Sequence, residues 1–184
     1  MMRGRLLAWA LIWPVAAFAQ NAADRRAQTE HLLDALKAAP TEAVAAPLET
    51  RLRQLWMESG TASVTLLMGR GLRAMKGQAT DDAVEAFSDA ITLDPNLAEA
   101  YHQRAIARYH TGDTEGAIRD LEATLTREPR DFAALRTLSE ISAAREDWKG
   151  AYNAWTKLLE IDPKTPGGED RLKELKRKAF GEDA

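Results

Sequence analysis

The chain has 184 residues, 45% of them apolar, and a formal net charge of −3. This length fits one domain with a packed core, and 11 glycines and 7 prolines are too few for a disordered chain. Long runs of basic residues are absent, which argues against a nucleic-acid partner because neutralising phosphates requires clustered Lys and Arg. The lack of cysteine excludes disulfides, thiolate metal sites, a cysteine nucleophile and a lipid anchor on cysteine.

Residues 1–19 have the three parts of a secretory signal peptide. Arg3 and Arg5 supply the positive start, residues 6–17 form the apolar centre, and Ala17 and Ala19 form a small-x-small cleavage site. We expect cleavage after Ala19, which leaves a chain without an integral membrane span in a bacterial periplasm. An uncleaved signal anchor is the alternative, although the apolar run is short for a membrane span.

Residues 20–60 are predicted to form a helical hairpin. Apolar residues recur at helical spacing over residues 21–38 and 42–58, and Ala39-Pro40 separates the two segments. Pro47 lies within the second segment and predicts a kink or a short break there. Because the hairpin lacks the pattern of the repeats that follow, and arrays need atypical ends, we interpret it as an N-terminal cap.

Residues 61–165 are dominated by a sequence period of 34. Each unit contains two amphipathic segments joined by a tight turn and closed by a proline, and the prolines Pro95, Pro129 and Pro163 keep the 34-residue step. The same step relates Ala83, Ala117 and Ala151, as well as Phe87, Leu121 and Trp155. Three uninterrupted units predict a helical array. We expect helices at about 62–76, 80–93, 97–110, 114–127, 131–144 and 148–160, with Thr80, Thr114, Asp131 and Asp147 as N-caps.

These units resemble the tetratricopeptide repeat, a 34-residue helix–turn–helix. Residues 98–131 match the family pattern best, and residues 64–97 and 132–165 match it at fewer positions. The matching residues of the middle unit are Tyr101, Ala105, Gly112, Asp113, Ala117, Leu121 and Pro129. The resemblance implies an all-α fold, an α-solenoid of three tandem repeats. It also implies that the first helix of each repeat lines a concave face, which binds an extended peptide or a partner's helix.

Residues 166–184 contain one more predicted helix, at 169–180. Leu172, Leu175 and Ala179 form its narrow apolar stripe, and most of its other residues are charged. We interpret it as a C-terminal capping helix on the last repeat. A basic helix that lies on an anionic membrane is the alternative, but the apolar face is narrow for that role.

The expected concave face changes from apolar through aromatic to charged along the array. Its candidate binding residues are Met68, Leu72, Met75, His102, Ile106, Tyr109, Arg136 and Glu140. As an alternative, residues 42–58 bury the three apolar residues of the first repeat. Some family members grip chaperone C-termini through basic and amide side chains, but the corresponding positions here are Met68, Leu72, Gln103, Ala133 and Thr137, so that carboxylate clamp is absent.

Arg104 and Asp120 occupy positions of the middle repeat that are normally core. They face each other across one helical hairpin, and we expect a structural ion pair. Alternatively, the Arg104 side chain reaches solvent alone.

No catalytic constellation is recognisable. His102 and His110 are two helical turns apart and cannot share one metal ion, so we expect exposed histidines, no metal site and no cofactor. The predicted function is a non-catalytic protein–protein interaction module, a periplasmic scaffold or co-chaperone with a protein or peptide partner. The alternative is an enzyme or metal-dependent binding protein that uses His102 and His110. Self-association through the array is a third possibility.

Overall fold

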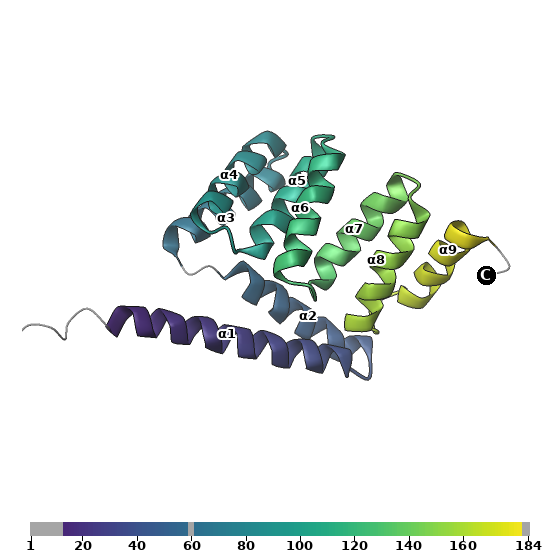
Figure 1. Ribbon diagram of the computed structural model, residues 1–184, viewed down its shortest axis with the longest axis horizontal. Helices are drawn as coiled ribbons and strands as arrows, with labels where there is room; N and C mark the ends of the chain where they lie inside the picture. Colours follow the sequence, from purple (N-terminus) through teal and green to yellow (C-terminus); the bar gives the residue numbers. More distant parts are fainter. Residues whose placement is uncertain (1–12, 59–60, 182–184) are drawn as a thin grey trace, which may run out of the picture.

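The computed structural model describes residues 13–58 and 61–181, which form nine α-helices and no strand (Figure 1). Residues 1–12, which include most of the expected signal peptide, lie outside the described part of the chain. None of the helices within residues 13–58 and 61–181 is long and apolar enough to cross a membrane. The helices are α1 (Trp13–Lys37), α2 (Glu42–Met57), α3 (Ala62–Lys76), α4 (Thr80–Leu93), α5 (Ala98–His110), α6 (Thr114–Arg127), α7 (Phe132–Ala144), α8 (Trp148–Ile161) and α9 (Gly168–Phe180).

Helices α3 to α8 form three stacked helical hairpins, as the 34-residue period predicts. Each pair α3–α4, α5–α6 and α7–α8 packs together, and α4 and α6 contact the first helix of the next pair. All six helices begin and end within one residue of their expected bounds. The fold is therefore an all-α solenoid.

The intra-repeat turn has a left-handed residue at the same position of every repeat. Gln78, Gly112 and Glu146 are spaced by 34 residues and have left-handed φ angles of 59°, 87° and 60°. Only the middle repeat places glycine at this position, where an L side chain is strained.

The helix caps differ in part from expectation. The Asp113 and Asp147 carboxylates accept hydrogen bonds of 2.9 Å from the backbone N–H groups of Gly116 and Gly150. The cap at Asp147 confirms the prediction. For α6 the predicted cap was Thr114, but Thr114 is the first helical residue and Asp113 is the cap. Helix α4 likewise starts at Thr80, so the predicted cap at Thr80 is wrong by one residue.

The N-terminal hairpin α1–α2 packs along the array, against the second and third repeats, and the end of α2 also reaches the first. Helix α1 contacts α8, and α2 contacts α5. In the largest hydrophobic cluster, Leu36 and Leu52 of the hairpin lie with Phe132 and Leu158. Figure 1 shows α1 and α2 running beneath the ends of the repeats at which α6 connects to α7. We expected this hairpin to cap the end of the array. Helical periodicity shows which face of a helix is buried, but it does not show which part of the protein that face packs against.

Two further contacts fix the hairpin. The rings of Trp56 on α2 and Phe132 on α7 lie with centroids 5.3 Å apart. Arg130, in the loop between α6 and α7, forms ion pairs with Glu30 and Asp34 of α1. Helix α2 continues through Pro47 as one helix, so of the predicted kink or short break the break is absent.

Helix α9 packs against α8 at the end of the array, the position expected for a C-terminal cap. Leu175 is fully buried, and the Trp155 indole Nε1–H donates a 2.9 Å hydrogen bond to the Gly168 carbonyl oxygen. The narrow apolar stripe of α9 thus covers the last repeat.

Candidate interaction surface

The first helices of the three repeats, α3, α5 and α7, lie side by side, with α5 in contact with both others. The structure places the eight predicted surface residues at different depths. Met68 and His102 are buried, Leu72, Met75, Ile106 and Arg136 are half-buried, and Tyr109 and Glu140 are exposed. The accessible part of this face is therefore smaller than expected.

Two polar side chains near the beginning of α5 are closed to solvent. Helix α2 packs against α5, and Glu99 and His102 in the first turns of α5 are only 5% and 4% exposed. Met57, at the end of α2, packs against the cluster that contains Met68. The prediction that His102 is exposed is thus wrong. Spacing along one helix does not show which neighbouring elements cover a residue of that helix.

The end of α5 carries the accessible apolar side chains. Tyr109 is 37% exposed, and its ring lies 6.4 Å from that of the exposed His110 in an edge-on arrangement. Ile106, one turn earlier, is half-buried. On α7, Arg136 is turned toward the loop before α9, where its Nη2 lies 3.5 Å from Thr165 Oγ1.

Arg104 and Asp120 come together as a two-point ion pair inside the middle repeat. Arg104 Nε and Nη2 donate to Asp120 Oδ2 and Oδ1 at 2.8 and 2.7 Å. Two further partners were not anticipated: Arg108 Nη1 donates to Asp120 Oδ2 at 2.9 Å, and Arg104 Nη1 donates to Ser88 Oγ at 3.1 Å. Arg108 lies one turn after Arg104 on the same helix, and this spacing could have predicted that both arginines reach Asp120.

A second buried polar cluster joins α5 to the start of α7. Glu99, His102 and Asp131 are all buried, and each offers one ligand atom within 4.8 Å of the others. Sequence analysis missed this cluster, although the Glu-x-x-His spacing puts Glu99 and His102 on one helix face. His110, the expected companion of His102, is exposed and is not part of the group.

The charges of this cluster influence one another. Burial raises the pKa of the Asp131 carboxyl to about 6, against the opposing charge of His102. Burial lowers the pKa of His102, but the neighbouring Glu99 and Asp131 carboxylates outweigh it and raise that pKa above its ordinary value. Asp131 also caps α7, since its Oδ1 accepts a 2.9 Å hydrogen bond from the Ala134 backbone N–H.

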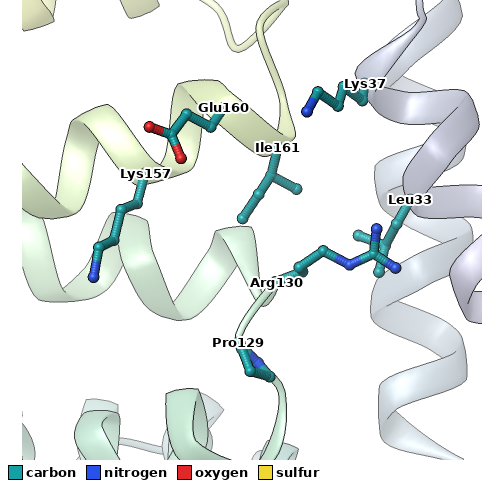
Figure 2. A pocket seen from close by; sticks show the side chains of 7 residues that line it. All are labelled: Leu33, Lys37, Pro129, Arg130, Lys157, Glu160 and Ile161. Carbon is teal, nitrogen blue, oxygen red and sulfur yellow. The ribbon is translucent and has the colours of Figure 1, made fainter.

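A shallow cleft lies where the N-terminal hairpin meets the repeats. Figure 2 shows side chains from three separate segments around it: the end of α1, the loop between α6 and α7, and the end of α8. Its lining residues are Leu33, Lys37, Pro129, Arg130, Lys157, Glu160 and Ile161. Since Arg130 is already paired with α1 carboxylates, the cleft is a seam between packed elements.

Comparisons with known proteins agree with the repeat architecture. No family model matches the chain. It is 28% identical over 137 residues to the TPR repeat-containing protein RHE_CH03534.1 of Rhizobium etli, covering 74% of this chain and 67% of that relative.

Two solved structures have a similar fold. The crystal structure of MamA protein superposes with a TM-score of 0.60 at 18% identity, covering 84% of each chain. The first TPR of Spaghetti (RPAP3), bound to the HSP90 peptide SRMEEVD, superposes with a TM-score of 0.59 at 16% identity. The match covers 62% of this chain and 91% of the other. The fold is thus that of an array of tetratricopeptide repeats. The sequence relative thus supports the tetratricopeptide-repeat family, and the two solved structures support the fold.

Proposed function

We propose that this chain is a non-catalytic protein-interaction module that binds a peptide or helix of a partner protein on the open end of α5. The observation that carries the proposal is Tyr109, a large side chain 37% exposed in the middle repeat, with Ile106 one turn away. Tyrosine is enriched among the residues that dominate binding energy in protein interfaces.

The structural neighbours support this function. The Spaghetti repeat domain is bound to an HSP90 peptide, so an array of this fold accommodates a peptide ligand. The present chain has Met68, Leu72 and Gln103 at three of the carboxylate-clamp positions, and Ala133 and Thr137 at the others. With no basic side chain at these positions, we expect recognition through apolar contacts instead of a terminal carboxylate.

We further propose that the module works in the bacterial periplasm, as a scaffold or co-chaperone for other envelope proteins. The support is the signal-peptide pattern of residues 1–19. Intact-mass measurement on protein from its native cells tests it. A chain that begins at Gln20 is expected, and a chain that retains residues 1–19 would favour the anchor alternative.

Capture of partners from a native envelope extract, with identification by mass spectrometry, tests the binding surface. Tyr109→Ala removes an exposed side chain, so the fold should persist while binding weakens by about 2 kcal/mol, or roughly 30-fold. Glu140→Ala, at an exposed polar position on α7, is the matched control and should bind normally. Undiminished capture by a folded Tyr109→Ala chain would place the binding site on another surface.

A further inference from the structure

The hydrogen bonds around His102 determine which ring nitrogen carries a proton. His102 Nε2 lies 3.1 Å from Thr137 Oγ1, and the Thr137 hydroxyl donates its own hydrogen to the Ala133 carbonyl oxygen at 3.0 Å. Since that hydroxyl has only one hydrogen, it accepts from His102, and Nε2 is the protonated nitrogen. In the neutral ring, Nδ1 then carries a lone pair.

This lone pair points into a group of negative atoms. Nδ1 is buried without a hydrogen-bond partner, and so is Oδ2 of Asp131. The nearest Glu99 oxygen lies 3.6 Å from Nδ1, too far for a hydrogen bond. Two carboxylates and an imidazole lone pair therefore converge in a space closed to water, an arrangement that requires a positive charge between them.

We propose that Glu99, His102 and Asp131 bind a divalent transition-metal cation of the Zn²⁺ type. One imidazole nitrogen and two carboxylate oxygens suit Zn²⁺, whereas Mg²⁺ and Ca²⁺ prefer oxygen ligands alone. Two positive charges neutralise the two carboxylates. The Nε2–H bond to Thr137 is the outer hydrogen bond that metal-binding histidines ordinarily make.

The observed spacing favours a metal ion over a proton. A proton shared between Nδ1 and Glu99 requires a contact shorter than 3.6 Å, whereas two ligands of one tetrahedral zinc ion lie about 3.3 Å apart. The ligand atoms of the three side chains all lie within 4.8 Å of one another, so a bound ion would draw these side chains closer together.

The location indicates a structural metal ion. Glu99 and His102 belong to the first turns of α5, and Asp131 is the N-cap of α7. An ion held by all three ties the second repeat to the third beneath the N-terminal hairpin. Because all three side chains are buried, the ion stabilises this junction and has no access to a substrate.

Calorimetric titration of the chelator-treated chain with Zn²⁺ at neutral pH tests the proposal. We expect one equivalent per chain and a rise in melting temperature. Glu99→Gln and Asp131→Asn preserve side-chain shape, and asparagine still caps a helix, so both variants should fold but bind Zn²⁺ at least ~10-fold more weakly. His110→Gln, which removes an exposed histidine, is the matched control and should bind like the parent chain.

Nitrogen-15 NMR of the His102 ring provides a readout that does not depend on the variants. Zn²⁺ should shift Nδ1 and leave Nε2 protonated. Absence of stoichiometric binding, undiminished binding by both carboxylate variants, loss of binding in His110→Gln, or an Nδ1 signal that responds to pH but not to Zn²⁺ would each overturn the proposal. The last result would identify a proton as the occupant.

Discussion

Replacing Asp120 with alanine should destabilise the middle repeat more than replacing Arg104 with leucine. Asp120 is 4% exposed and accepts two hydrogen bonds from Arg104 and one from Arg108. Asp120→Ala therefore leaves the Arg104 guanidinium, whose side chain is 15% exposed, without its carboxylate. Breaking a buried pair in this way costs roughly 3–5 kcal/mol.

Arg104→Leu has a smaller expected cost because Asp120 keeps its contact with Arg108. Leucine restores the apolar residue usual at this repeat position, and the lost charged hydrogen bonds cost about 1–3 kcal/mol. In a chain of this size, 1 kcal/mol shifts the melting temperature by roughly 2–4 °C. The two variants should thus differ by several degrees.

Thermal unfolding followed by circular dichroism measures both shifts, with Asp120→Asn as the variant that preserves shape. If charge stabilises the site, the melting temperature of Asp120→Asn should be close to that of Asp120→Ala. If packing stabilises it, the melting temperature should be closer to that of the parent chain. An equal or reversed ranking of Asp120→Ala and Arg104→Leu would refute the reasoning from the ion pair.

Two further predictions concern glycine positions and are checked by the same melts. Gly71→Ala places a Cβ 2.4 Å from the Phe87 ring and should cost roughly 1–3 kcal/mol, whereas Gly69→Ala meets only the end of a flexible arginine and should be neutral or stabilising. Glu146→Gly should raise the melting temperature by relieving a left-handed φ of 60°. Gly112→Ala, at φ 87°, should lower the free energy of unfolding by about 1–2 kcal/mol and so lower the melting temperature. Destabilisation by Gly69→Ala or by Glu146→Gly would contradict these assignments.

The repeat period predicted the helices because local rules and tertiary packing agree in this segment. Proline and the turn residues recur every 34 positions, so the sequence gives three independent signals for where each helix of the repeat begins and ends. The approach of Arg104 to Asp120 followed from the same register, since both residues belong to one hairpin. These features depend on contacts between elements that are adjacent in the chain.

The surroundings of His102 could not be predicted in this way. Its neighbours include Asp131, the N-cap of α7, and Thr137 on α7, and α2 packs on the same helix as His102. A histidine at a groove position is exposed in an open array and buried when another helix covers the groove. Helical periodicity showed that residues 42–58 bury one face, but many surfaces of an array can complement such a face.

The position of the N-terminal hairpin has a consequence for the order of folding. The hairpin is synthesised before the repeats, yet it packs against Phe132 and Leu158 of the third repeat. An open array can gain or lose stability one repeat at a time, because each repeat contacts only its neighbours. Here the hairpin joins distant parts of the chain, because its packing on Phe132 and Leu158 requires a formed third repeat. We therefore expect docking of the hairpin to couple repeats that would otherwise melt separately into one cooperative transition.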